Sequence, residues 1–495
     1  MLRRFVLAVG ALLALPVLAD PTAPPSADPL AGYNGSFFLR DPNSWFVLFP
    51  KGRLQIDSYN FLNRGDPPNG ANGLPVDANS KGDKRPNGTL LVRRARIELQ
   101  GTMARHFDFQ IAAEYASTPA VGSTGTVSDA WVNVNYTPYL QLRVGQFDAP
   151  FTLENCTSDK FFDFMERSLA IRAFAVPQNK ELGAMLWGYL PNRLAYYSLG
   201  FFNGEGQNFK NQDSHYALIG RAFVAPLATL AGDRDWLKEM WLGGSIWYQT
   251  AVNQGGRVAP SVSGATQNDL PLLTTQGGFG FFAADYDNGK DPSGAAIRSH
   301  LAPSGDTLKW AVEANLPVKQ FGARLELVHQ TIHLAQYNDT NPTNATLLRS
   351  PVFSDAQELS GTGYYVELYG WLLGHRKVIE SPGLGLPPRL STLAPVKEPT
   401  WALMVAAKLE HVGFDVVGLP MPNGMVDPAQ GHHGIDAVEL GVNGWLTKHV
   451  RLTANYVVNF IGGFSSDESD AKNMKSNLFY QRAEHELLFR LGIGL

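Results

Sequence analysis

The sequence predicts an all-β fold, a closed antiparallel transmembrane β-barrel of about sixteen strands. Three observations predict this fold class. Segments of about ten residues alternate between apolar and polar side chains, as strands between lipid and water must. Short turns and long polar loops follow one another along the chain. Charged residues make up 17% of the 495 residues, below the roughly 25% of ordinary globular proteins, while glycine occurs 49 times.

The N-terminal segment has the features of an export signal. A basic head, Met1–Arg4, precedes the apolar stretch Phe5–Leu18, and small residues before Asp20 suit a signal peptidase. We therefore predict three segments: a signal peptide at 1–19, a proline-rich lead-in at 20–50 and the barrel at 51–495. No later run of about 18 apolar residues predicts a transmembrane helix.

Composition also excludes several classes of protein. Cys156 is the only cysteine, which excludes an intrachain disulfide and a lipid-modified N-terminal cysteine. We expect this cysteine to be an inert thiol. The net charge of −4 gives no reason to expect nucleic acid as a partner.

Alternation is clear in Leu308–Leu316, where every second residue is apolar and the residues between them are mainly polar. The same period recurs in Phe321–Gln330, Trp401–Glu410, Val450–Phe460 and Leu487–Leu495. A half-buried strand of a soluble sandwich has the same period, so alternation alone leaves that fold open.

The lengths of the connections favour the membrane. Short turns are predicted near Thr102–His106, Thr137–Tyr139, Pro191–Arg193, Pro317–Gln320 and Thr447–His449. Between them lie long polar or Gly/Pro-rich segments: Asn63–Gly88, Asp148–Glu181, Gly204–Ser214, Ala251–Asp306, His333–Ser360, His411–Gly434 and Ile461–Arg482. Short periplasmic turns and long extracellular loops are the expected asymmetry of an outer-membrane barrel. Two connections on the short side, Ala225–Leu237 and Gly374–Lys397, are longer than this pattern predicts.

The strand count predicts a channel. Counting from Lys51, about sixteen strands fit the chain, an even number as closure of a single-chain bacterial barrel requires. The sheet has to close because lipid offers no partner to an open edge. A ring of this size is too wide for side chains to fill, so we expect its interior to hold water.

Arginines lie on the first two predicted strands. By parity, Arg53 faces the lumen from the first strand, and Arg94 and Arg96 face it from the second. Arg93 has the wrong parity, so it needs either a β-bulge or a buried contact with another subunit.

Two interpretations of these arginines remain open. Inside a water-filled barrel they would attract anions, because the low-dielectric wall strengthens their field. Alternatively, each arginine pairs with a neighbouring carboxylate of the lumen, such as Glu98 or Glu114.

The segment from Phe147 to Glu181 is unusually apolar for a loop. It contains five further phenylalanines: Phe151, Phe161, Phe162, Phe164 and Phe174. A loop with so much apolar surface has to pack against something. We expect it to fold into the barrel and narrow the lumen, where constrictions set selectivity. The alternative is that it packs outside, on neighbouring subunits.

Several motifs resemble those of a known family, the phosphate-selective porins O and P. The matching segments are Gly52–Gln55, Arg93–Ala95, Gln146-Phe147, Leu153-Glu154, Thr157-Ser158, Lys160, Glu166–Leu169, Gly363–Tyr365, Leu440–Asn443 and Ala454–Val457. The resemblance covers most of the mature chain in the same order. It implies a trimeric sixteen-stranded porin with an inward loop. It also implies that Arg53, Arg93, Arg94 and Ser158 occupy positions that bind phosphate in the family.

The chain departs from the family pattern at two loop positions. Asn155 stands where the family has a lysine, and Asp159 stands where it has a serine. The loss of a cation and the gain of an anion both weaken a phosphate site, because binding depends on the local sum of charge. The loop as a whole also carries more acidic residues than basic ones.

Other motifs do not predict catalysis or metal binding. His329–His333 has the histidine spacing of a zinc protease but lacks the glutamate base, and on a strand the two rings lie too far apart. We expect His432-His433 to lie in a solvated loop. Gly278–Gly280 has no helix after it to form a phosphate cradle. We therefore predict neither an enzyme nor a bound cofactor.

Taken together, these observations predict a trimeric porin of the bacterial outer membrane that passes small hydrophilic solutes, preferring anions, with phosphate as one candidate. Arg53, Arg94 and Arg96 would supply the field, and a constriction loop with Asn155, Asp159, Lys160 and Arg167 would narrow the passage. Its partners would be small anions or other small solutes, outer-membrane lipids and two further copies of the chain. Alternatives are a general diffusion porin with weak or no anion selectivity, an outer-membrane barrel enzyme and a secreted β-protein.

Overall fold

The computed structural model describes residues 30–33, 36–62, 88–116, 125–175, 179–211, 214–251, 273–276, 280–282, 285–290, 296–339, 350–374, 401–417, 431–461 and 483–494. The predicted signal peptide, 1–19, lies outside these residues. Among the described residues, no helix is long and apolar enough to cross a membrane.

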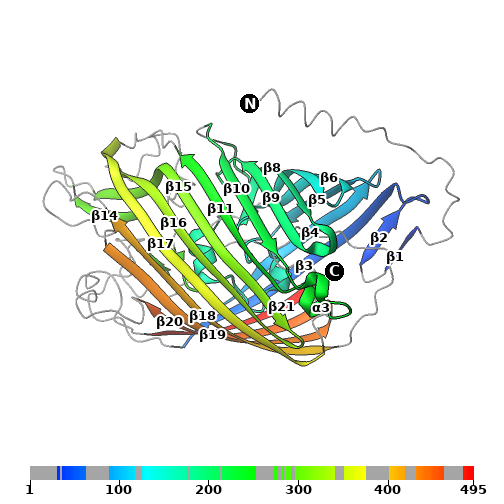
Figure 1. The fold of residues 1–495 in the computed structure, drawn as a ribbon. Coiled ribbons are helices and arrows are strands. Elements are labelled where there is room, and N and C mark those ends of the chain that lie inside the picture. The colour runs from blue at the N-terminus through cyan, green and yellow to red at the C-terminus, as the bar shows by residue number, and fades with distance from the viewer. Residues whose placement is uncertain are drawn as a thin grey trace.

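Sixteen antiparallel strands form a closed ring (Figure 1). Neighbours along the chain pair with each other, and β21 pairs with β3 from Glu486↔Phe61 to Gly494↔Arg53, which closes the barrel. The strands of the ring are β3 Phe46–Phe61, β4 Thr89–Met103, β5 Phe107–Glu114, β6 Thr126–Thr137, β7 Leu140–Asp148, β8 Lys180–Tyr189, β9 Ala195–Phe202, β10 Ala217–Val224, β11 Trp241–Ala251, β15 Ala296–Val318, β16 Phe321–Asp339, β17 Ser350–Leu373, β18 Ala402–Val417, β19 Gly431–Thr447, β20 Val450–Ile461 and β21 Glu484–Gly494. The predicted strand number and closure are confirmed.

The two faces of the strands differ as the alternation predicts. On β15, Trp310 and Val312 are exposed on the outside, whereas Lys309 and Glu313 are buried on the inside. This is the reverse of a soluble protein, because the apolar side chains of a transmembrane barrel have lipid as their solvent. The polar side chains that face inward are the ones that can shape a passage.

The turns divide the barrel into a short end and a long end. Tight turns join β4 to β5, β6 to β7, β15 to β16 and β19 to β20, and the short helix η3 (Pro191–Arg193) joins β8 to β9. The connection between β10 and β11 is longer and contains η4 (Ala228–Leu230) and α3 (Asp235–Lys238). It reaches the inner wall, where Asn315 Nδ2 donates to the Glu239 carbonyl at 2.8 Å. The segment Gly374–Lys397 lies outside the described residues except for its first residue.

The lead-in contributes to the sheet. Strands β1 (Ala31–Tyr33) and β2 (Phe37–Arg40) pair with each other, and β2 continues the sheet onto β3. Strand β3 begins at Phe46, earlier than the predicted start at Lys51. Phe38, Val47 and Phe49 form a small apolar cluster that holds this edge in place.

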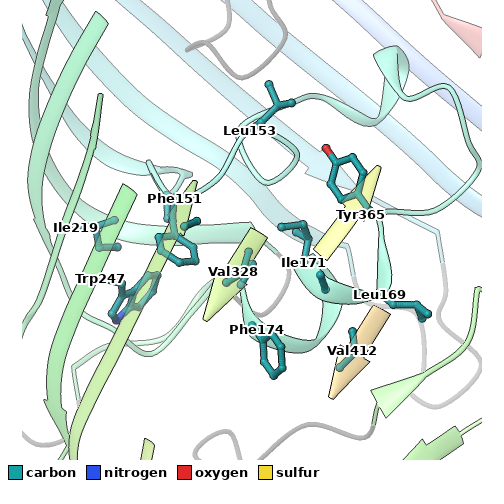
Figure 2. Close-up of a cluster of buried hydrophobic side chains, with 14 of the residues drawn as sticks. Phe151, Leu153, Leu169, Ile171, Phe174, Ile219, Trp247, Val328, Tyr365 and Val412 are labelled. Carbon is teal, nitrogen blue, oxygen red and sulfur yellow. The ribbon is translucent and has the colours of Figure 1, made fainter. Parts of the chain in front are cut away.

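The loop between β7 and β8 packs against the inner face of the barrel. It contains η1 (Asp159–Phe161) and α2 (Leu169–Phe174), and most of its phenylalanines are buried. Figure 2 shows Phe151, Ile171 and Phe174 gathered with Trp247, Val328 and Val412 of the wall. This packing accounts for the apolar side chains that made the segment unusual as a loop.

A second segment also reaches the interior, which the sequence did not predict. Within the expected loop after β11, the structure has β12 (Leu273–Thr274), β13 (Gly280–Phe282) and β14 (Asp285–Lys290). Just after β12, Thr275 Oγ1 donates to Glu486, and Gln276 Nε2 donates to Glu410 Oε1 at 2.6 Å. Arg172 of α2 in turn donates to the Thr275 carbonyl at 2.9 Å. The two inward segments therefore brace each other.

Candidate functional site

A β-bulge on β4 turns two consecutive arginines inward. Gln55 of β3 pairs with Arg94, but the next residue, Ile56, pairs with Val92, so Arg93 is the extra residue. Arg93 Nε and Nη2 donate to the two carboxylate oxygens of Glu166 in the loop, each at 3.0 Å. Of the two solutions expected for Arg93, the structure has the bulge.

Arg53 links the wall to the loop. Its Nη2 donates to Glu98 Oε1 at 3.1 Å, and its Nη1 donates to Asp159 Oδ2 at 3.2 Å. Ser158 Oγ accepts a further hydrogen bond from Arg53 Nη2 at 3.3 Å. Ser158 precedes Asp159 at the start of η1, so one guanidinium contacts two successive loop side chains.

Asp159 lies where three arginines meet. Its Oδ2 is 3.2 Å from Arg53 Nη1 and 3.0 Å from Arg94 Nε, and its Oδ1 is 3.0 Å from Arg167 Nη1. Burial alone would raise the pKa of Asp159, but the guanidiniums of Arg94, Arg167 and Arg53 hold that pKa well below its ordinary value. Asp159 is therefore ionised and forms the negative centre of the cluster.

Arg96 and Lys160 lie beside this centre. Arg96 Nε donates to Glu114 Oε2 at 3.2 Å, and Lys160 Nζ lies 3.8 Å from Glu98 Oε2. Burial lowers the pKa of Lys160 to about 8, helped by the positive charges of Arg53 and Lys51 and opposed by Glu98. The Lys160 ammonium therefore loses its charge just above neutral pH.

Three basic side chains, those of Arg93, Arg94 and Lys160, are more exposed than the carboxylates that pair with them. The side chains of Arg93 and Lys160 are 29% and 28% exposed, against 10% for Glu166 and 8% for Glu98. Arg94 is 16% exposed and its partner Asp159 is 8% exposed. A solute passing this wall therefore meets the cations first.

Carboxylates of the far wall hold the loop by its backbone. Glu326 of β16 accepts hydrogen bonds from the amides of Leu153 and Glu154, the latter at 3.1 Å. Glu410 of β18 accepts one from the Leu169 amide at 2.5 Å. These anchors were not among the predicted site residues, although the parity of their strands places both side chains inside the barrel.

Glu166 and Arg490 were also missed by sequence reasoning. Arg490 Nη2 donates to Asp57 Oδ2 at 2.6 Å and to Glu166 Oε1 at 3.2 Å, so Glu166 bridges Arg93 and Arg490. The sequence does show that Arg490 has the inward parity on the last strand. Parity does not identify its partner in the loop, however.

Asn155 does not join the cluster. Its side chain is buried at the base of the loop, where Nδ2 donates to the carbonyls of Ala149 at 3.0 Å and Asn179 at 3.3 Å. It fastens the two ends of the loop together. The structure thus brings together Arg53, Arg93, Arg94, Arg96, Ser158, Asp159, Lys160 and Arg167, and leaves Asn155 apart.

Other reactive residues lie away from this cluster. His329 bonds Thr362 and His333 bonds the Asp306 carbonyl, each at 2.9 Å, and in the described part of the chain no group of His, Cys, Asp and Glu is arranged to hold a metal. His432 lies on strand β19, so its expected place in a loop was wrong. Burial raises the pKa of the Cys156 thiol to about 12, in agreement with an inert cysteine.

Comparison with known proteins gave the following matches. Residues 70–263 match the family model described as phosphate-selective porin O and P. No curated protein matches the chain in sequence. Solved structures that match include the trimer form of OmpT from Vibrio cholerae (9% identity, 91% of this chain and 99% of that chain, TM-score 0.47). They also include the outer membrane channel DcaP of Acinetobacter baumannii (8% identity, 91% of this chain and 97% of that chain, TM-score 0.47). A third is an anion-selective porin from Comamonas acidovorans (10% identity, 91% of this chain and 100% of that chain, TM-score 0.42).

Proposed function

We propose that this chain, which its residues 70–263 place in the phosphate-selective porin O and P family, carries small anions past a basic wall of its barrel. The family match confirms three predictions made from the sequence: the family, the outer-membrane channel and its place in the bacterial outer membrane. The preference for anions and the residues that produce it are our proposal.

The difference in exposure between cations and carboxylates carries the proposal. Arg93, Arg94 and Lys160 are partly exposed on the inner face, while their carboxylate partners are more buried. A charge at the surface of a water-filled passage acts on a permeating ion more strongly than one screened behind it. The field that a solute meets is therefore positive.

The charge balance of the cluster agrees with this sign. Six cations, Arg53, Arg93, Arg94, Arg96, Lys160 and Arg167, share four carboxylates, Glu98, Glu114, Asp159 and Glu166. Arg490 and Lys180 also touch the cluster, together with Asp57, Asp129 and Asp148, so eight cations face seven carboxylates. An excess of one positive charge supports a modest anion preference, well short of the preference that six unpaired cations would produce.

Passage is passive in this proposal and needs neither a cofactor nor a catalytic step. The loop narrows the barrel because it is fastened to opposite walls, to Arg53 on β3 and to Glu326 and Glu410 on β16 and β18. The partly exposed cations lie where the loop meets β3 and β4, and the proposed path for ions passes them.

The test is the reversal potential of the purified protein in a planar bilayer under a roughly tenfold KCl gradient, for which perfect selectivity gives about 59 mV. We expect the sign of the reversal potential to show that the channel prefers chloride over potassium. Arg94→Gln and Lys160→Gln should each move it toward zero, whereas Arg105→Gln should not. Arg105 lies in the exposed turn after β4, where it contacts the Asn43 carbonyl and Trp45. A cation-selective native channel, or equal shifts in all three variants, would refute the proposal.

We further propose that the channel is a homotrimer, as its family resemblance implies. The wall from β5 to β10 supports a contact there, because β5, β9 and β10 have only eight residues each. A tilted strand needs about 9–11 residues to cross the hydrocarbon. Contact with another subunit would shield this low wall from lipid. Chemical cross-linking in native membranes should yield a trimer band that survives boiling in SDS; a monomer throughout would contradict it.

A further inference from the structure

The carboxylate of Asp159 takes the place that an oxyanion would take in the arginine cluster. Both of its oxygens are used: Oδ2 contacts Arg53 and Arg94, and Oδ1 contacts Arg167. Three guanidiniums that converge on two oxygens form the kind of charge-assisted site that binds phosphate and sulfate. The occupant of this site is supplied by the chain itself.

We propose that Asp159 is a tethered counter-anion that keeps tetrahedral oxyanions, such as phosphate and sulfate, from binding tightly in the passage. This inference rests on the proposed function, since it concerns the selectivity of the same channel. Asp159 neutralises part of the field of the three arginines, so monovalent anions pass it without a deep binding site. Its removal exposes an oxyanion site that the native channel conceals.

The groups around Asp159 would suit such a ligand. Ser158 Oγ is 3.3 Å from Arg53 Nη2, so its hydroxyl stands beside the same guanidinium. Within the described part of the chain, Arg53 Nε is a buried donor without a hydrogen-bond acceptor, and Arg94 Nε lies 3.0 Å from Asp159 Oδ2 without the geometry of a hydrogen bond. A tetrahedral anion offers more acceptor oxygens than one carboxylate, and Lys160, 28% exposed, adds a cation at the edge. The site therefore has unused capacity for an oxyanion once Asp159 is removed.

The attachment of the loop explains why a free anion does not displace Asp159. On one side, Glu154 accepts a hydrogen bond from the Ser168 amide at 2.8 Å, and on the other Asp163 pairs with Arg324 at 2.7 Å. Asp159 is thus held in place by neighbours on both sides. A tethered group competes at an effective concentration of order millimolar or higher, and its positional entropy is already lost. A free oxyanion has to exceed that concentration to enter.

The experiment measures block of the KCl current by added phosphate, and separately by sulfate, for the native channel and for Asp159→Ser. We expect half-block of Asp159→Ser at a concentration at least roughly tenfold lower than for the native channel. Asp159→Asn keeps the shape of the side chain and loses its charge, so it should show the same direction of change. Asp148→Asn is the matched control, because it removes one negative charge beside Lys180 while Lys180 keeps its ion pair with Asp129. This variant should leave the block by phosphate and sulfate unchanged.

The outcomes separate this inference from the proposed function. Equal half-block concentrations in the native channel, Asp159→Ser and Asp159→Asn would overturn the inference even if the native channel prefers chloride. Tight phosphate block of the native channel would also overturn it. If the loop moves in Asp159→Ser, its conductance will change, and Asp159→Asn then decides the question. A native channel that prefers cations would instead refute the proposed function.

Discussion

Ion pairs of single residues set the charge that a solute meets in this barrel. Arg53, Arg93, Arg94 and Arg96 each have a carboxylate within 3.2 Å. Of the two interpretations left open by the sequence, pairing with carboxylates is therefore what the structure shows. The pairing weakens the arginine field without cancelling it, because the cations outnumber their partners and because Arg93, Arg94 and Lys160 are more exposed than theirs.

Lys160 makes the selectivity depend on pH. Its pKa is lowered to about 8, so the ammonium is charged at neutral pH and neutral well above pH 8. The chloride preference should therefore fall as the pH is raised from about 7 to about 9. The reversal potential at each pH measures this fall. In Lys160→Met the fall should be absent, and an equal fall in that variant would show that another group is responsible.

At the scale of the elements, glycines on the strands make room for the loop. A Cβ on Gly363 of β17 would lie 2.8 Å from the Cβ of Ala170 and 3.1 Å from Phe174 in α2. A Cβ on Gly441 of β19 would lie 2.9 Å from Phe164. These contacts are too close for any side chain, so helix α2 and the loop depend on glycine at these points.

Gly363→Leu should therefore push α2 away from the wall. We expect a loss of about 1–3 kcal/mol in the free energy of unfolding, the usual cost of overpacking, and a noisier or larger single-channel conductance. The measurements are the temperature at which the folded band converts on a denaturing gel and recordings of single channels. Gly444→Ala on β19 is the control, because its Cβ would meet nothing within 4 Å. The same conversion temperature and the same conductance in both variants would contradict the packing of α2 against β17.

The elements differ in how far the sequence predicts them. Leu308–Leu316 and Val450–Phe460 were predicted as strands because alternation is a local property that lipid and water impose on every residue. The parity of Arg93 predicted either a bulge or a contact with another subunit, and the structure has the bulge. The contact of Arg53 with Asp159 did not, because it joins residues 106 positions apart. The inward segment at Thr275 was not predicted either, because its residues show no alternation of apolar and polar side chains.

At the scale of the whole molecule, the interior is filled unevenly. The apolar core formed by the loop packs against β6–β11 and β15–β20 and includes Tyr59 of β3 and Leu488 of β21, and inward residues such as Asn455 and Glu439 are almost completely buried. Arg93, Arg94 and Lys160, by contrast, keep 29%, 16% and 28% exposure where the loop meets β4. The proposed path for ions therefore runs past these three cations.

The position of this path is the central claim, and cysteine modification tests it most directly. In a Cys156→Ser background, the current through Arg94→Cys and through Asn455→Cys is recorded before and after a negatively charged methanethiosulfonate reagent is added. We predict that the reagent lowers the chloride current of Arg94→Cys and leaves that of Asn455→Cys unchanged. A reagent that acts on Asn455→Cys and spares Arg94→Cys would contradict the account, because ions would then pass along the wall that the loop covers.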